Sequence, residues 1–245
     1  MIKAFIQRYK VNMAEAAQPD PEKYESFNQF FTRQLAPELR PIAANSQEIS
    51  CPCDGEISEF GQIKQDSLLQ AKNHSYRLVE LLGGDAEKAA LFENGSFATF
   101  YLAPKDYHRV HIPIDGALQQ MSHLPGKLFS VNLRTANTVP NLFARNERVI
   151  TIFQTAAGTM AVILVGAMIV ASIGTSWAGL ITPPFRKTIR HWKYDDVFLK
   201  KGDELGYFQL GSTAIVLFQA NSVDWQEKLV VGQSVKMGQT IARLR

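Results

Sequence analysis

The longest apolar stretch of the chain runs from Met160 to Ile173. Its 14 residues fall short of the roughly 20 that a membrane-crossing helix needs. It is rich in valine and isoleucine, which favour strands, and Gly158 and Gly174 bound it. We therefore expect buried β-strand here, as two strands with a break near Gly166.

Short apolar stretches separated by turn residues continue over most of the chain after Ser50. They predict strands near residues 50–63, 95–104, 109–123, 148–155, 206–218 and 239–244. Two helical patches interrupt them, one capped by Ser75 and closed by Gly83, the other at 85–92. The prediction is an α+β fold, with helices first, then a mostly antiparallel β body and a strand-rich C-terminal segment.

The N-terminal residues carry two helical patterns. In the first, one face is apolar and basic residues lie largely elsewhere; its apolar residues are Ile2, Phe5, Ile6, Tyr9 and Met13. Such a helix either lies in a membrane interface or docks on its own domain, and periodicity alone favours docking. The second begins at Ser26, a typical N-cap, and its apolar stripe consists of Phe27, Phe30, Phe31 and Leu35.

Length and charge set broad limits. A chain of 245 residues forms one large domain or two small ones, and we divide it into N-terminal helices, 1–45, and a main domain, 46–245. A net charge of +3 tolerates an anionic membrane but does not argue for nucleic acid. The first residues lack the uninterrupted apolar run and cleavage site of a secretory signal.

The cysteines do not indicate a metal or redox site. Cys51 and Cys53 are separated by one residue, whereas zinc and redox pairs usually have two between them. We read them as reduced structural thiols and assign no metal site.

The strand and turn pattern near the C-terminus is similar to that of lipoyl carriers. Those carriers present a Met-Lys pair in a tight turn, whereas here Lys236 precedes Met237 and the pair lies in a different turn, so we reject that function.

Polar residues interrupt the apolar pattern at three places. Asp54 stands in an Asp-Gly turn, His108 and His111 lie three apart after a strong strand, and Ser212 lies in the middle of "YFQLGSTAIVLF". Asp54 on its own has an ordinary structural explanation, because Asp-Gly is a common turn. Together, however, the three residue types suit nucleophilic chemistry, with a histidine as acid or base.

The surroundings of Ser212 do not fit a hydrolase. A nucleophile elbow places Gly-x-Ser-x-Gly between a strand and a helix, whereas here Gly211 directly precedes Ser212 and a strand follows. A serine in a strand has another target, the carbonyl of its own preceding residue. Glycine does not obstruct that attack, and it permits the backbone angles that the attack requires.

Ordered blocks along nearly the whole chain resemble the phosphatidylserine decarboxylase family, most closely its bacterial membrane-associated branch. The blocks are "FNQFFTRQLAPELRPI", "CDGEIS", "YLAPKDYHRVHIPIDG", "PGKLFSVN", "NLFARNERV", "VGAMIVASI", "WAGLITPP" and "LGST". The resemblance implies a zymogen that cuts itself between Gly211 and Ser212, leaving a β chain, 1–211, and an α chain, 212–245. In it His111 takes the Ser212 proton and Asp54 orients His111, while Ser212 becomes a covalent pyruvoyl cofactor.

The resemblance also implies the reaction. The pyruvoyl ketone would form a Schiff base with the amine of phosphatidylserine, and loss of carbon dioxide would give phosphatidylethanolamine, a step of phospholipid biosynthesis. His108 would protonate the carbanion or contact the substrate, Thr213 would orient the new terminus, and Arg109 or Arg148 would suit the lipid phosphate. The two chains would stay together as a heterodimer, which could assemble further.

A lipid substrate changes how the N-terminal helix is interpreted. Membrane docking becomes the favoured reading, with the enzyme peripheral at the cytoplasmic face of the inner membrane. Related bacterial enzymes often carry further apolar segments before this point, so we expect either that the chain is truncated or that it anchors with less. The alternatives are a Ser-His-Asp lipid hydrolase, which would leave the chain intact, and a non-catalytic membrane-binding module.

Overall fold

The computed structural model describes residues 1–71, 74–167, 172–182, 188–209 and 211–245. Its main element is a nine-stranded sheet, and every strand pair of that sheet is antiparallel. In spatial order its strands are β12 (Arg190–Lys193), β7 (Gly116–Leu124), β8 (Arg148–Thr155), β9 (Gly158–Gly166), β15 (Ser212–Phe218), β5 (Ser96–Leu102), β2 (Gly55–Gln62) and β17 (Ser234–Val235), with β13 (Phe198–Leu199) also paired to β7.

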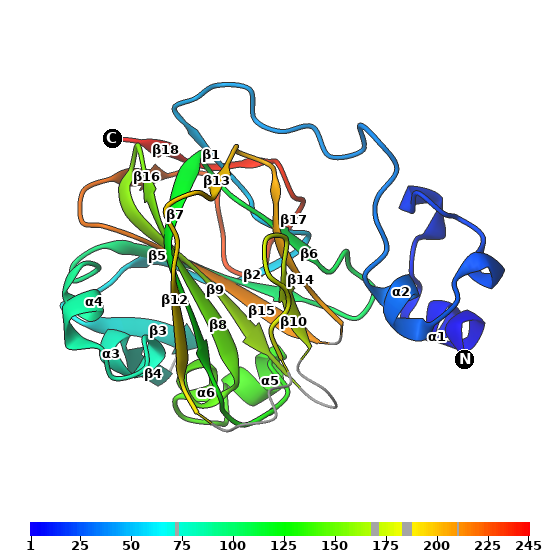
Figure 1. Ribbon diagram of the computed structural model, residues 1–245, viewed down its shortest axis with the longest axis horizontal. Coiled ribbons are helices and arrows are strands. Elements are labelled where there is room, and N and C mark those ends of the chain that lie inside the picture. Colours follow the sequence, from blue (N-terminus) through cyan, green and yellow to red (C-terminus); the bar gives the residue numbers. More distant parts are fainter. Residues whose placement is uncertain (72–73, 168–171, 183–187, 210) are drawn as a thin grey trace.

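Three smaller sheets complete the β body (Figure 1). One consists of β11 (Gly179–Leu180), β10 (Ile173–Thr175), β14 (Glu204–Phe208) and β6 (Arg109–His111). The others are β1 (Glu48–Ser50), β18 (Thr240–Leu244) and β16 (Val223–Trp225), and the hairpin of β3 (Ser67–Ala71) and β4 (His74–Arg77). The helices are short: α1 (Ile2–Tyr9), α2 (Phe27–Phe31), α3 (Leu78–Leu81), α4 (Ala86–Ala90), α5 (Leu133–Ala136) and α6 (Leu142–Arg145), with 3-10 turns at Met13–Glu15 and Pro21–Lys23. The expected α+β class and element order are confirmed.

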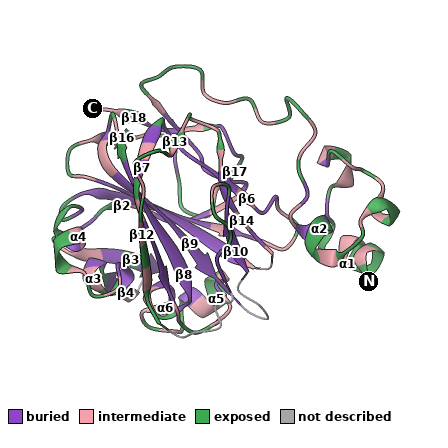
Figure 2. Cartoon of the chain, in the orientation of Figure 1, coloured by how far each residue is buried: buried purple, intermediate pink, exposed green. Residues whose placement is uncertain are grey.

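Strand β15 lies between β9 and β5 and is buried on both faces (Figure 2). Successive side chains of a strand point to opposite faces, so β15 serves two cores. Ala214, Val216 and Phe218 belong to one apolar cluster, and Ile215 and Leu217 belong to the other. This double burial explains why residues 214–218 are continuously apolar rather than alternating.

The apolar stretch at 160–173 forms strands as expected. Strand β9 ends at Gly166, where we placed the break, and β10 begins at Ile173. Residues 168–171 of this stretch lie outside the described residues.

Two helix boundaries differ from the prediction. Helix α2 ends at Phe31 rather than near Leu35, because residues 34–36 are extended and pair with residues 15–17 through backbone hydrogen bonds. Ser75 is not a cap: it lies in strand β4, and the helix after it starts from Arg77. In both places strand pairing overrode a local helical signal, with a distant segment after α2 and within the β3–β4 hairpin at Ser75.

The N-terminal helices gather at one side of the β body (Figure 1). Helix α1 docks on α2: the ring of Phe5 lies 5.0 Å from that of Phe27 and 6.0 Å from that of Phe31, centroid to centroid. The segment between β5 and β6 reaches toward α2, where the Arg33 side chain donates hydrogen bonds to the carbonyls of Lys105 and Asp106. The N-terminal region therefore contacts the segment that carries His108.

Candidate active site

Ser212 is the first residue of β15 and is completely buried. It pairs with Gly166 of β9 and Leu102 of β5, so its backbone is held from both sides. Gly211 before it has a φ of +25°, a value that favours glycine. Among the described residues, a Cβ at Gly211 would meet the Cβ of Ala167, at 3.6 Å, which is an ordinary contact, so the positive φ is the constraint that these residues show at this position.

His108 contacts Ser212. Its Nδ1 lies 3.1 Å from Ser212 Oγ, and its Nε2 lies 3.0 Å from the carbonyl oxygen of Ala103. Because a carbonyl only accepts hydrogen bonds, Nε2 carries the proton and Nδ1 accepts from the serine hydroxyl. The ring of Phe31 stacks on His108, with centroids 4.0 Å apart, and fixes the plane of the imidazole.

The environment of His108 strongly favours its neutral form. Complete burial, followed by the positive charge of Arg33, lowers the pKa of His108 to about 3. Its bonding partners are the Ala103 carbonyl and the Ser212 hydroxyl, and neither is a carboxylate. An imidazolium here would readily give up its proton.

His111 lies on β6 and makes different contacts. Its Nδ1 lies 2.8 Å from the Gly202 carbonyl oxygen, so Nδ1 carries the proton, and its Nε2 accepts from the Tyr107 hydroxyl at 3.0 Å. The pKa of His111 lies below its ordinary value, because burial and the charge of Arg109 outweigh the Gly202 carbonyl and the charges of Glu204 and Asp54, which act in the opposite direction. Unlike His108, this histidine has nearby negative charge to support an imidazolium.

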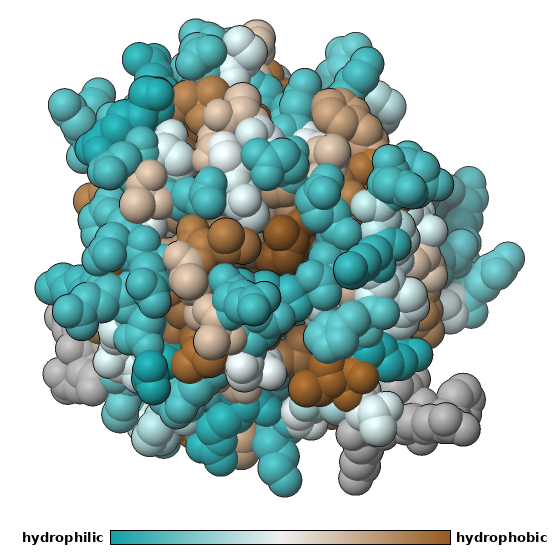
Figure 3. Space-filling view, turned by 60° about the vertical axis from the view of Figure 1, so that its left-hand side comes forward, coloured by the Kyte–Doolittle hydropathy of each residue, from teal (hydrophilic) through white to brown (hydrophobic). Residues whose placement is uncertain are grey.

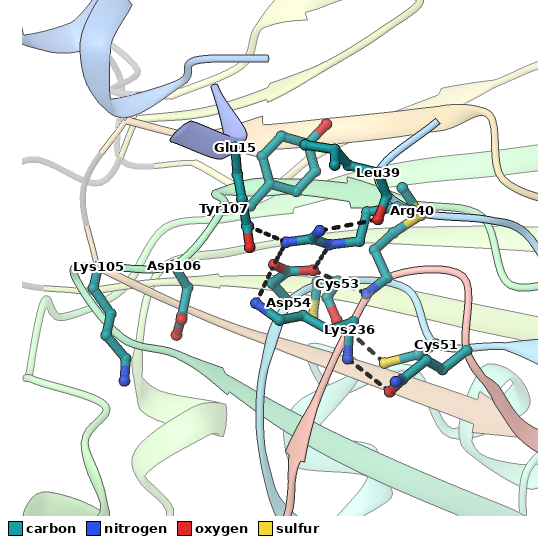
Figure 4. Close-up of polar contacts among 12 residues, drawn as sticks. Glu15, Leu39, Arg40, Cys51, Cys53, Asp54, Lys105, Asp106, Tyr107 and Lys236 are labelled. Atoms are coloured by element: carbon teal, nitrogen blue, oxygen red, sulfur yellow. Dashed lines mark hydrogen bonds and ion pairs between the residues drawn. The ribbon is translucent and has the colours of Figure 1, made fainter. Parts of the chain in front are cut away.

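Asp54 is held in an ionic cluster (Figure 4). Its carboxylate accepts from Arg40 at 2.9 and 2.6 Å, from Lys236 Nζ at 3.0 Å and from the Met237 N–H at 3.0 Å. Arg40 also pairs with Glu15. Burial alone would raise the pKa of Asp54, but the Arg40, Met237 and Lys236 hydrogen bonds outweigh it, so its pKa lies below the ordinary value.

The structure thus unites part of the predicted set. It brings His108 to Ser212, whereas the hydrogen bonds of His111 and Asp54 go to other groups. Sequence reasoning did not assign Arg33, Arg40, Tyr107 or Lys236 to the site. Arg33 and Arg40 lie in a block that resembles the family, and this was the one available signal for them.

Metal-binding groups and membrane-crossing helices are both absent from the described residues. These residues contain no group of three or more histidine, cysteine or acidic side chains arranged to hold a metal ion. Among the helices described here, none has the length and apolar character to cross a membrane.

Comparison with known proteins identifies relatives over nearly the whole chain. The family model for phosphatidylserine decarboxylase matches residues 27–243. The phosphatidylserine decarboxylase proenzyme of Bordetella avium is 55% identical over 99% of this chain and 83% of its own length. That of Pseudoalteromonas atlantica is 53% identical over 100% of this chain and 87% of its own, and that of Pseudomonas entomophila is 54% identical over 97% and 84%. The chain therefore belongs to the phosphatidylserine decarboxylase family.

Proposed function

We propose that this phosphatidylserine decarboxylase makes its own cofactor by cleaving the peptide bond between Gly211 and Ser212. The observation that carries the proposal is a buried serine hydroxyl, directly after a glycine with positive φ, that donates to a histidine nitrogen. The relatives are named as proenzymes, which agrees with an activating cleavage.

The cleavage needs no outside reactant until its last step, which uses water. Ser212 Oγ bonds to the Gly211 carbonyl carbon and loses its proton, and the carbon–nitrogen bond breaks to leave an ester and a free amine. Loss of the Ser212 Cα proton and breakage of the Cβ–Oγ bond release Gly211 as a carboxylate and leave dehydroalanine. Water then converts this residue to a pyruvoyl group and ammonia, giving a β chain, 1–211, and an α chain, 212–245.

His111, supported by Asp54, is our choice for the base that takes the Ser212 proton. His108 is closer, but its pKa of about 3 makes it a weak base. His111 already has the required tautomer and lies near negative charge. To act as the base, His111 must break the hydrogen bond between its Nε2 and the Tyr107 hydroxyl and move Nε2 to Ser212 Oγ. This choice therefore requires a rearrangement, whereas His108 already contacts Ser212.

The residues around Ser212 fit a pyruvoyl group. When formed, the group would supply an electron sink for loss of carbon dioxide, and its keto carbon would be the Cα of Ser212. His108 sits against this residue in a site without solvent exposure, and its low pKa makes its protonated form a strong acid toward a carbanion. Thr213 Oγ1 is buried without a hydrogen-bond partner among the described residues, so a donor remains beside the new terminus.

Strand pairing would hold the two chains together after the cut. All residues of β15 belong to the α chain, while β5 and β9 on either side belong to the β chain. Removing β15 would expose both apolar cores, so we expect the fragments to remain associated.

We also propose a peripheral position at the cytoplasmic face of the inner membrane. Much of the apolar face of α1 packs on α2, but none of its residues is fully buried. Exposed apolar side chains also occur on the β body, and Figure 3 shows separate apolar patches on a largely hydrophilic face; the most exposed are Leu180, Ile189, Phe198, Val230 and Val231. Flotation with phosphatidylglycerol vesicles, compared with phosphatidylcholine vesicles, tests membrane binding.

Carbon dioxide release from carboxyl-labelled phosphatidylserine tests the function. We expect release by the native protein and none by Ser212→Ala. Ser122→Ala is the matched control, because Ser122 is also a buried strand serine bonded to a histidine, here His191. Release by Ser212→Ala would overturn the proposal. An intact chain labelled at Ser212 by a fluorophosphonate would instead indicate the hydrolase.

A further inference from the structure

A cavity of about 410 Å³ lies between the N-terminal region and the β body. Four basic side chains line it: Lys10, Arg33, Lys105 and Lys236. It also has four acidic side chains: Glu15, Asp54, Glu56 and Asp106. Such a mixed lining suits a ligand that carries charges of both signs.

Arg33 is the most deeply buried of these bases, with 5% of its surface exposed. Its Nη2 donates to the Lys105 and Asp106 carbonyl oxygens at 3.0 and 3.2 Å. Its Nε and Nη1 have no hydrogen-bond partner among the described residues, and the guanidinium lies 5.4 Å from the centre of the Phe30 ring. Both nitrogens expose less than 1 Å² of surface. Buried donors are almost always paired, so two unpaired donor nitrogens on one buried cation point to an anion that enters when this part of the site opens.

The acids of the cavity are largely engaged elsewhere. Asp54 and Glu15 both pair with Arg40. Asp106 accepts from the Ala103 N–H at 2.8 Å, and burial raises its pKa, which disfavours its charge. Arg33 makes no ion pair with these groups within 4.0 Å in the part of the chain that the structure describes.

Other arginines considered for a phosphate are already bonded. Arg109 pairs with Glu204 at 2.6 Å and donates to the Thr32 carbonyl. Arg148 donates to the carbonyls of Leu81, Asn146 and Glu80. In both arginines Nε and Nη1, the two nitrogens that are unpaired in Arg33, have partners.

Arg33 is also close to the reacting residue. Phe31, two positions earlier, stacks on His108, which contacts Ser212. Arg33 itself binds the turn that leads into His108. In phosphatidylserine four covalent bonds separate the amine from phosphorus, a span of about 5 Å. Binding of the phosphodiester at Arg33 therefore requires Ser212 and Arg33 to lie within reach of one headgroup, and the contacts through Phe31, His108 and the turn at 105–106 link the two residues.

We propose that Arg33 binds the phosphodiester of the phosphatidylserine headgroup through Nε and Nη1. The proposal rests on the proposed function, since the amine must react at Ser212. A planar guanidinium matches two phosphate oxygens. The substrate carboxylate is the poorer ligand, because its charge disperses as carbon dioxide leaves, and a cation on it would stabilise the ground state more than the transition state.

The test uses dihexanoylphosphatidylmethanol, a phosphodiester without amine or carboxylate, as a competitive inhibitor of the cleaved enzyme. Arg33→Met should raise its Ki, and the KM for dihexanoylphosphatidylserine, by about tenfold or more; Ki is the deciding value, because kcat also responds to the effect of Arg33 on His108. Arg33→Lys should give an intermediate value, and Arg243→Met, a change at an exposed arginine, should leave Ki unaltered. An unchanged Ki overturns the proposal. A raised KM with unchanged Ki would assign Arg33 to the carboxylate and also overturn it.

Two readouts separate this proposal from the proposed function. The mass of the fragment 212–245 reports cleavage in every preparation, so failure of self-cleavage is seen independently of binding. If the variants do not fold, the Arg33 Nε–H resonance of the native protein decides: it should shift on titration with dihexanoylphosphatidylmethanol. A resonance that stays fixed while the inhibitor binds contradicts the proposal.

Discussion

Two buried polar regions of this enzyme are built in opposite ways. Asp54 accepts four hydrogen bonds, three of them from the cations Arg40 and Lys236, and is stabilised as an anion. Ser212 and His108 are both completely buried and share one neutral hydrogen bond. The first region is electrostatically complete, whereas the second keeps neutral groups where a new charge would be costly. Transfer of a proton to His108 or from Ser212 would therefore create a buried charge that the site does not stabilise.

The N-terminal region contributes to both. Glu15 and Arg40 belong to the Asp54 cluster, while Phe31 stacks on His108. The division into residues 1–45 and 46–245 stays a prediction. These contacts argue, however, that the first part shapes the site in addition to any role at a membrane.

The largest effect should come from replacing each of the two histidines with alanine. We expect His111→Ala to remain uncut, because it removes the base with nearby negative charge. His108→Ala should still be cut but should lose nearly all decarboxylation. Denaturing electrophoresis and carbon dioxide release measure the two steps separately. Efficient cutting of His111→Ala, with an uncut His108→Ala, would show that contact with Ser212 matters more than charge and would make His108 the base.

A smaller effect, on the free energy of unfolding, should distinguish the buried Asp54 from the partly exposed Lys236 of the same cluster. In a Ser212→Ala background, which keeps one chain, Asp54→Asn should lower the free energy of unfolding by about 3 kcal/mol, because it leaves buried Arg40 under-compensated. Lys236→Met should cost below about 1 kcal/mol, because the Lys236 side chain is 47% exposed. Urea denaturation measures both, and equal costs would contradict the description of Asp54 as the centre of the cluster.

The effect of acid is the smallest of the three near neutral pH and grows as the pH falls. The pKa of His108 is about 3 in the folded chain and near 6.5 when unfolded, so the unfolded chain binds the extra proton. Its contribution to stability is present above about pH 6.5 and falls by about 1.4 kcal/mol per pH unit below it. Asp54, whose folded pKa is lowered, loses its contribution only in stronger acid, as pH falls through that pKa.

His108→Gln in the Ser212→Ala background should therefore flatten the dependence of unfolding free energy on pH between about 6 and 4.5 by roughly one proton. Denaturant titrations at several pH values measure this slope. An unchanged slope would mean that His108 is not held neutral by its surroundings.

Much of the fold could be predicted from local pattern. The apolar runs at 160–166 and 214–218 give β9 and β15 because burial on both faces leaves a continuous signal. The end of α2 and the start of the helix after Ser75 could not be predicted, because strand pairing takes up the residues after the first and before the second.

The site was predictable in residue type but not in contact. Interruptions of the apolar pattern singled out Asp54, His108, His111 and Ser212. Resemblance to a family then assigned their roles, which stay predictions. The partner Lys236 lies 182 positions from Asp54, so tertiary folding alone brings them together. Which histidine ring meets Ser212 depends on the turn before β6, and the spacing of three residues leaves both orientations open.

The mass of the C-terminal piece tests the central claim most directly. Freshly purified protein should contain a fragment of residues 212–245 that is lighter than its serine-ended form by one ammonia molecule and that resists N-terminal sequencing. A full-length chain that persists in active preparations, or a fragment that begins with an unmodified serine, would contradict the account.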